Sequence, residues 1–275
     1  MTNAASLTVT NLRDAPEFDV LAETIRTISK RRELVFIPSP GNWGDALINV
    51  GTEQFLAANG FAPRVLKRDE FLAEIDVGAK PFKNAVVLVG GGGGWCENWH
   101  STRNFLEAIG TIVRDVIVLP TTYELSVDHS RRSNVIYFRR DNGGSKAVAP
   151  HSTFCHDMAF FLDVDRLEPE PHAWRIKAFR GDKERSPDAH STEPSVDISM
   201  LGNSYHGVRP FFQILSRFDV IHTDRLHVAI AGSMLGKRAV LMPGNYAKAR
   251  DVWSSSLEPN FANAKFKEWA DYKPD

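Results

Sequence analysis

The stretch VIHTDRLHVAIAGSMLGKRAVLMPG, Val220–Gly244, shows the clearest alternation of strand and helix patterns in the chain. An apolar run is followed by Thr-Asp, by a helical pattern over residues 225–235 and by a second apolar run. Free backbone N–H groups and the positive end of the helix dipole lie at a helix start, where cations are mildly unfavourable. Arg225 and His227 in this position therefore indicate a site that binds an anion.

The same alternation extends along the chain in both directions. Apolar strand patterns lie near residues 34–37, 84–89, 115–120 and 134–138, and glycine-rich or charged loops and helical patterns separate them. This arrangement predicts parallel sheets with helices on both faces. Proline and charge cluster at LEPEPHAW, which suggests a boundary near residue 168.

We therefore expect an α/β protein with two Rossmann-like lobes and a cleft between them. Residues 1–168 form the first lobe, residues 169–250 form a smaller second lobe, and residues 251–275 form a terminal helix that packs back on the body. Phe266 and Trp269 supply the apolar side of that helix, and VDISMLGNS in the second lobe reads as a strand. Ligands of open α/β sheets bind beyond the carboxyl ends of strands.

The composition excludes several classes of protein. The 275 residues carry a net charge of −1, which argues against phosphate neutralisation and hence against a nucleic-acid partner. No apolar run approaches the ~18 residues of a membrane span. The first residues show no pattern of a secretory signal. The two cysteines, Cys96 and Cys155, fit neither a disulfide framework nor a zinc spacing. The default expectation is a cytoplasmic protein without a bound metal.

The loop PGNWGDALI has two interpretations. Its glycines allow a ligand close to the backbone, and Asn42 and Asp45 can hydrogen-bond sugar hydroxyls. Alternatively, the segment is a tight turn and Asp45 only caps the following helix. The nine residues do not decide between the two.

A second loop, LVGGGGGWCENW, follows a predicted buried strand. It loosely satisfies a dinucleotide fingerprint, but no acidic residue stands at a fitting second strand end, so a nicotinamide cofactor is not expected. Five glycines are entropically costly after a strand, which favours a loop that faces a substrate. Trp95 and Trp99 either form a platform for a sugar or simply pack.

Basic residues follow strand ends throughout the second lobe. Arg180 lies in AFRGDKE, Arg225 opens TDRLH, and Lys248 and Arg250 follow the strand pattern at residues 238–244. Together they suit a small, multiply charged anion, because the arginine fork matches carboxylate and phosphate oxygens. Neither an acyl-transfer elbow nor a P-loop motif is present.

These motifs resemble the polysaccharide pyruvyl transferase family. The resemblance rests on GNWGDALI, the strand before the glycines, HDMAFFL, FRGDKE and above all TDRLHVAIAGSMLGKRAVLMPGNYAK. It covers about residues 36–248. Proteins of this family have a two-lobed fold like that of GT-B glycosyltransferases, and they attach the pyruvyl group of phosphoenolpyruvate to a sugar as a ketal.

The resemblance implies roles for particular residues. Arg180, Arg225, Leu226 and His227 would hold phosphoenolpyruvate, with Lys248 close by, and His227 and Arg225 would act in catalysis. The acceptor side would comprise Asn42, Asp45, Gly92, Gly93 and Trp95. The partners would be phosphoenolpyruvate and a sugar acceptor, and no cofactor is expected.

The residues suit this chemistry, although other functions stay open. Arginines and a helix start can hold a carboxylate and a phosphate, and histidine titrates near neutral pH, which suits a proton donor. One alternative is a glycosyltransferase that uses a nucleotide sugar in the same cleft. Another is a sugar-binding protein of a polysaccharide assembly complex. The sequence leaves open the acceptor sugar, its lipid linkage, a peripheral contact with the inner face of the membrane and the oligomeric state.

Overall fold

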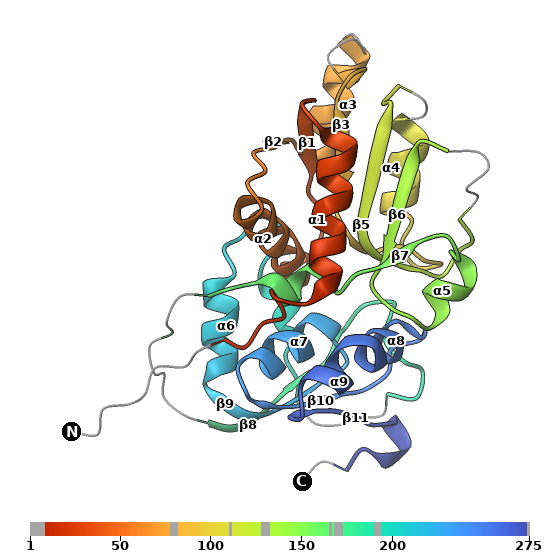
Figure 1. The fold of residues 1–275 in the computed structure, drawn as a ribbon. Coiled ribbons are helices and arrows are strands. Elements are labelled where there is room, and N and C mark those ends of the chain that lie inside the picture. Colours follow the sequence, from red (N-terminus) through yellow and green to blue (C-terminus); the bar gives the residue numbers. More distant parts are fainter. Residues whose placement is uncertain are drawn as a thin grey trace.

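Two parallel β-sheets organise the part of the chain that the structure describes, one of seven strands and one of four (Figure 1). The computed structural model describes residues 9–77, 82–109, 112–127, 133–164, 167, 173–189 and 194–273. The chain passes from the first sheet to the second between Phe154 and Ala173. The predicted α/β class with parallel sheets is confirmed, whereas the assignment of a function to each lobe stays a prediction.

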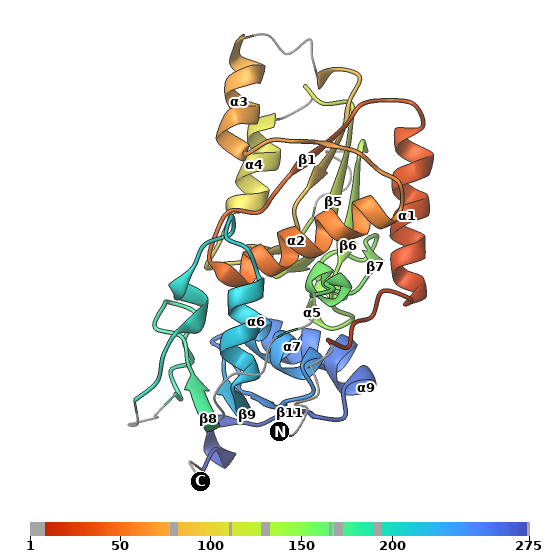
Figure 2. The same ribbon diagram turned by 90° about the vertical axis from the view of Figure 1, so that its left-hand side faces the viewer.

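The first sheet has the strand order β2-β1-β3-β5-β6-β7, and the short β4 pairs with β5. Alternate residues of each strand face opposite layers: Phe36 and Leu88 pack with α1 and α2, while Val35 and Val87 pack with α3 and α4. Figure 2 shows α1 on one side of this sheet and α3 and α4 on the other. The strands are β1 (Leu34–Ile37), β2 (Arg64–Val65), β3 (Val86–Val89), β4 (Gly92–Trp95), β5 (Asp115–Tyr123), β6 (Val135–Arg139) and β7 (Thr153–Phe154). The helices are α1 (Pro16–Ser29), α2 (Trp43–Ala58), α3 (Arg68–Val77), α4 (Ser101–Ile109), α5 (Gly144–Val148) and the 3₁₀ turn η3 (Met158–Phe161).

The second sheet has the order β11-β10-β9-β8, and all its pairs are parallel. Ile221 and Leu241 lie in the same core as Val228 and Ile230 of α7, and α2 also contributes to that core, so one apolar interior joins the two halves. The strands are β8 (Ala173–Ala178), β9 (Phe218–Thr223), β10 (Arg238–Leu241) and β11 (Ala264–Phe266). The helices between the strands are η4 (Ile198–Leu201), α6 (Arg209–Ser216) and α7 (Leu226–Met234).

The chain after residue 247 differs from the single terminal helix that we expected. It forms α8 (Lys248–Val252), a π-helical turn η5 (Trp253–Leu257), α9 (Glu258–Asn260), the strand β11 and the 3₁₀ turn η6 (Trp269–Asp271). The helical part does pack back on the first half, where the backbone N–H of Gly144 donates to Asp251 Oδ2 at 2.9 Å. Phe266 instead lies in β11, because the edge of β10 offers backbone partners that replace the hydrogen bonds of a helix.

A second difference concerns residues 196–204, for which the sequence predicted a strand. Residues 198–201 form η4 instead, and the Met200 N–H donates to the Asp197 carbonyl at 3.0 Å. Only Ile198 of its apolar side chains is fully buried, while Met200 and Leu201 are exposed. The prediction of a strand over residues 196–204 is therefore wrong. Among the described helices, none is both long and apolar enough to cross a bilayer.

Candidate functional site

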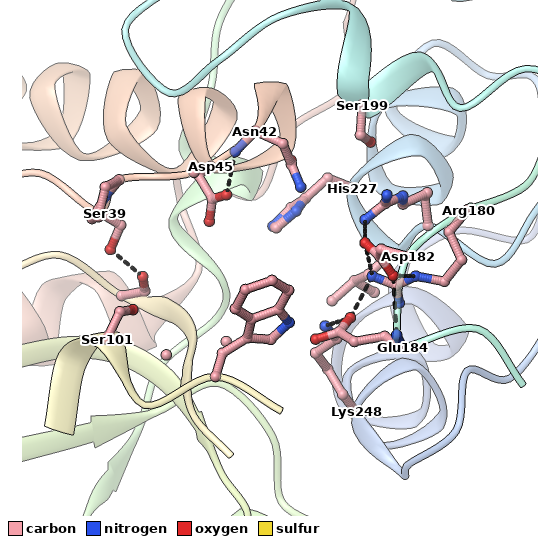
Figure 3. Close-up of a pocket in the computed structure, with 18 of the residues that line it drawn as sticks. Ser39, Asn42, Asp45, Ser101, Arg180, Asp182, Glu184, Ser199, His227 and Lys248 are labelled. Atoms are coloured by element: carbon pink, nitrogen blue, oxygen red, sulfur yellow. Dashed lines mark hydrogen bonds and ion pairs between the residues drawn. The ribbon is translucent and has the colours of Figure 1, made fainter. Parts of the chain in front are cut away.

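A cavity of about 580 Å³ lies where strand ends of the two sheets meet. Its walls come from loops that follow β1, β3, β6, β8, β9 and β10, so both halves contribute to it (Figure 3). The volume is in the usual range of a small-molecule site. The lining includes Ser39, Asn42, Asp45, Gly91, Gly93, Gly94, Trp99, Arg140, Arg180, Asp182, Glu184, Arg225, Leu226, His227 and Lys248.

The five residues expected to hold the donor all line this cavity: Arg180, Arg225, Leu226, His227 and Lys248. Figure 3 shows Arg180 and Lys248 on one side of the cavity and Asn42 and Asp45 across from them, with His227 between the two groups. Leu226 is 5% exposed and also belongs to the core. The structure thus brings these five residues together although Arg180 and Lys248 are 68 positions apart.

Both arginines are held by carboxylates, which the sequence analysis did not foresee. Asp182 binds both guanidinium groups, at 2.8 Å from Arg180 Nε and 2.8 Å from Arg225 NH1. Arg225 Nε also donates to Asp197 Oδ1 at 2.9 Å, and Arg180 pairs with Glu184. Burial would raise the pKa of Asp182, but the two arginines lower it below its ordinary value. The cations are therefore fixed in place and largely balanced in charge.

Arg225 occupies the N-cap position of α7, one residue before the helical turn in which we expected it. Its backbone is extended, and its N–H donates to Thr223 Oγ1 at 2.9 Å. Asp224 does not cap the helix, because its Oδ1 accepts from the backbone N–H of Arg180 at 2.7 Å. The carboxylates of Asp182 and Asp197 offset the repulsion between the Arg225 guanidinium and the helix dipole.

His227 faces a buried ion pair that sequence reasoning missed. Its Nε2 lies 3.5 Å from Oδ2 of Asp157, and Arg140 NH1 donates to the same oxygen at 2.6 Å. Asp157 also accepts the backbone N–H of Ala159 at 2.9 Å. Burial would raise the pKa of Asp157, but Arg140 and His227 hold it below its ordinary value. Arg140 and Asp157 follow β6 and β7, so their positions just beyond strand ends could have indicated a place near the site.

Asn42 and Asp45 form the helix cap that one interpretation of their loop predicted, whereas their contact with a sugar stays a prediction. Asn42 Oδ1 accepts from the Gly44 N–H at 2.8 Å, and Asp45 Oδ2 accepts from the Asn42 N–H at 2.9 Å, which is a capping box at the start of α2. Both residues also line the cavity. Burial raises the pKa of Asp45, although His227 opposes the shift. A Cβ on Gly44 would lie 2.6 Å from His227 Nδ1, so the two lobes touch at this glycine.

The glycine-rich loop, which we expected on the acceptor side, approaches Lys248 and Arg140 closely. A Cβ on Gly93 would lie 3.6 Å from Lys248 Nζ and 3.8 Å from Arg140 NH2. Gly92 stands behind the cavity wall beside Ile48, with a φ of +115° that favours glycine. Gly93 therefore lies between the two lobes rather than on the acceptor side alone.

Trp95 does not reach the cavity. It is 6% exposed and packs against Tyr123 and Tyr137, with ring centroids 5.5 and 5.9 Å away, in the core that α3 and α4 cover. Trp99 lines the cavity instead, is 43% exposed and has Lys183 Nζ 4.0 Å from its ring centroid.

Within the described residues, no group of three or more His, Cys, Asp or Glu side chains is placed to hold a metal ion.

Comparisons with known proteins match this architecture. The family model described as "Polysaccharide pyruvyl transferase" matches residues 42–246. A Bacillus subtilis (strain 168) protein named "Putative pyruvyl transferase EpsO" is 23% identical over 294 aligned residues, which cover 86% of this chain and 89% of that protein. The crystal structure of a functionally uncharacterised Klebsiella pneumoniae protein superposes with a TM-score of 0.75 at 23% identity, over 90% of this chain and 97% of that one. The structural match supports the fold alone, whereas the family match covers most of the chain and most of the residues that line the cavity, although Ser39 and Lys248 lie outside it. The chain belongs to the polysaccharide pyruvyl transferase family.

Proposed function

We propose that this protein transfers the pyruvyl group of phosphoenolpyruvate to two hydroxyls of a sugar in a polysaccharide or cell-surface glycan. The product is a ketal, and phosphate is released. The observation that carries the proposal is the convergence of Arg180, Arg225, Lys248 and His227 on one cavity, opposite Asn42 and Asp45. The family membership supports pyruvyl transfer as the type of reaction.

The donor would lie among the cations of the second lobe. Arg180 and Arg225 can hold a carboxylate or a phosphate through their forked N–H groups, and Lys248 adds a point charge. Leu226 would contact the three-carbon unit. Arg140 joins this set, because its NH2 lies near Gly93 and Lys248 while its NH1 stays on Asp157. When the donor binds, Asp182 has to share Arg180 and Arg225 with it or release them.

The proposed reaction involves no oxidation or reduction. His227 gives a proton to the methylene carbon, which becomes a methyl group, while one sugar hydroxyl oxygen bonds to the adjacent carbon and loses its proton. The bond from that carbon to the phosphate oxygen then breaks, and phosphate leaves. The second hydroxyl adds to the same carbon and loses its proton, which closes the ketal.

Asp45 is placed to act on the acceptor. Its carboxylate lies on the cavity wall near His227, and a carboxylate there can accept the proton of an attacking hydroxyl. Asn42 and the exposed face of Trp99 would position the sugar, with Trp99 in place of Trp95. On this proposal the first lobe serves the acceptor and the second the donor, and the cleft works as it does in GT-B enzymes.

Calorimetric titration separates the proposal from its alternatives. Phosphoenolpyruvate should bind with measurable heat, and Arg180→Ala should abolish that heat. A thermal melt of the variant checks its fold, because Arg180 is the partner of the buried Glu184 carboxylate. Binding of nucleotide sugars but not of phosphoenolpyruvate would favour a glycosyltransferase. Binding of glycans alone, with no phosphate release from phosphoenolpyruvate, would favour a sugar-binding protein.

A further inference from the structure

Glu184 is a buried carboxylate in a cavity that we assign to an anionic donor. Its side chain is 2% exposed. Oε2 accepts from Lys248 Nζ at 2.7 Å, Oε1 accepts from the Tyr246 hydroxyl at 2.8 Å, and Arg180 forms an ion pair with the same group. A negative charge here would repel phosphoenolpyruvate, so its presence needs a reason other than contact with the donor.

The surroundings of Lys248 supply that reason. The Lys248 side chain is 13% exposed, and two other cations, Arg180 and Arg140, act on its ammonium. Burial lowers the pKa of Lys248, Glu184 raises it, and both arginines lower it further. Other ionisable groups that interact with the ammonium, among the described residues, are Asp45 on α2, the Cys96 thiol after β4 and Tyr246, whose ring centroid is 4.8 Å from Nζ.

The backbone around Glu184 keeps its carboxylate beside Lys248. The Glu184 carbonyl accepts from the Asn245 N–H at 3.0 Å, and the Asn245 side chain donates to the Lys183 carbonyl at 2.9 Å. A Cβ on Gly244 would lie 2.9 Å from the Glu184 carbonyl oxygen, so the two loops meet at van der Waals distance. The loops after β8 and β10 are therefore bound to each other, and their contacts hold Glu184 beside Lys248.

We propose that Glu184 is a positioning residue that keeps the Lys248 ammonium charged and fixed beside Arg180 and Arg140. The use of that charge for phosphoenolpyruvate rests on the proposed function. The carboxylate faces the cations, and the cations face the donor. Loss of the carboxylate therefore weakens the binding of an anion to this site, although the carboxylate itself repels anions.

The test compares Glu184→Gln with Tyr246→Phe. The first variant removes the charge and keeps the shape. The second removes the hydrogen bond from Tyr246 to Glu184, and the 3.8 Å one from Cys96 Sγ to Tyr246, and keeps the charge. Competitive labelling with acetic anhydride, followed by mass spectrometry of the Lys248 peptide, gives the pH midpoint of this amine without any donor present. We expect the midpoint to fall by at least about one pH unit in Glu184→Gln and to stay near that of the wild type in Tyr246→Phe. Equal midpoints in all three proteins would overturn the proposal.

Two further measurements complete the design. Glu184→Asp retracts the carboxylate and should lower the midpoint in the same direction by less than Gln does, so it carries the test if Glu184→Gln does not fold. The phosphoenolpyruvate affinity of Glu184→Gln should fall about tenfold per pH unit above its lowered midpoint and recover at lower pH. A shifted midpoint in a protein that never binds phosphoenolpyruvate would refute the proposed donor and leave the role of Glu184 standing.

Discussion

Nε2 of His227 lies 3.5 Å from Oδ2 of Asp157, and this same oxygen accepts a 2.6 Å hydrogen bond from Arg140. The distance to His227 is that of an ion pair rather than of a short hydrogen bond. Asp157 belongs to the first half of the chain and His227 to the second, so the contact joins them behind the cavity. The negative charge of Asp157 beside the ring can orient His227, the proposed proton donor.

Asp157→Asn should therefore lower kcat more than it changes KM for phosphoenolpyruvate. It should also lower stability, because removal of one partner of a buried ion pair costs about 3–5 kcal/mol. Steady-state kinetics and urea unfolding test the two effects separately. Asp163→Asn is the matched control, since its side chain is 61% exposed. An unchanged kcat in a folded Asp157→Asn protein would show that His227 does not depend on this carboxylate.

Gly44→Ala should reduce activity with little loss of fold. The added methyl carbon would lie 2.6 Å from His227 Nδ1, so the imidazole has to move. Gly207→Ala is the control, because no atom lies within 4 Å of a Cβ at that glycine. Turnover measured beside a thermal melt distinguishes a displaced histidine from an unfolded protein. Wild-type turnover in Gly44→Ala would contradict a catalytic position for His227.

Arg225→Lys should weaken phosphoenolpyruvate binding although the charge is kept. Lysine cannot reproduce the forked contacts with Asp197 and Asp182, or with a carboxylate of the donor. Loss of a charge-assisted hydrogen bond is worth about 1.5–3 kcal/mol, or roughly one to two decades in Kd. Calorimetry measures the change, and Arg250→Lys, with a half-exposed side chain on α8, should bind like the wild type. Equal affinity of both variants would place the donor elsewhere.

Asp224→Asn should stabilise the protein above pH 6. Burial raises the pKa of Asp224 to about 6, and one of its oxygens, Oδ2, has no hydrogen-bond partner among the described residues. Because the folded pKa exceeds the unfolded value of about 3.9, the contribution of the carboxyl to stability is present below pH 4 and is lost between pH 4 and 6. Asparagine keeps the acceptor for the Arg180 N–H and removes this dependence, which is of order 2–3 kcal/mol.

Unfolding free energies of wild type and Asp224→Asn at several pH values check this prediction. The two should agree near pH 4 and diverge as the pH rises to 7. Exposed Asp271→Asn should follow the wild type throughout. A variant less stable than the wild type at pH 7 would mean that the attraction of ionised Asp224 to Arg180 and Arg225 outweighs the cost of burying its charge.

Much of the fold could be predicted from local pattern. The sequence from Val220 to Gly244 has apolar runs of strand length on either side of a helix, and these form β9, α7 and β10 with small changes at the ends. The three-residue strand β11 could not be predicted in this way, because it is defined by the edge of β10 and not by its own side chains. Helix α3 was also missed, since its pattern is weakly amphipathic, with only Phe71 and Ile75 buried.

The candidate site, like the fold, could be predicted from the sequence only in part. Residues at strand ends of the second half were predicted, because charged residues after parallel strands converge at one edge of the sheet. The carboxylates Asp182, Glu184 and Asp197 were not assigned a role, since pairing with an arginine depends on three-dimensional distance. Trp95 was assigned to the acceptor by its glycine neighbours, but alternation along β4 turns it into the core that α3 and α4 cover. Trp99, beyond the strand end, lines the cavity.

The fate of the methylene carbon of phosphoenolpyruvate tests the central claim most directly. The protein would be incubated in D₂O with phosphoenolpyruvate ¹³C-labelled at that carbon and with a panel of free and lipid-linked glycans, and the products followed by NMR. We predict that one glycan acquires a labelled methyl group with a single deuterium, attached to a ketal carbon, while phosphate appears in equal amount. His227→Gln should slow this conversion strongly. Label that stays in phosphoenolpyruvate with every acceptor, while a nucleotide sugar is consumed under the same conditions, would contradict pyruvyl transfer and favour a glycosyltransferase.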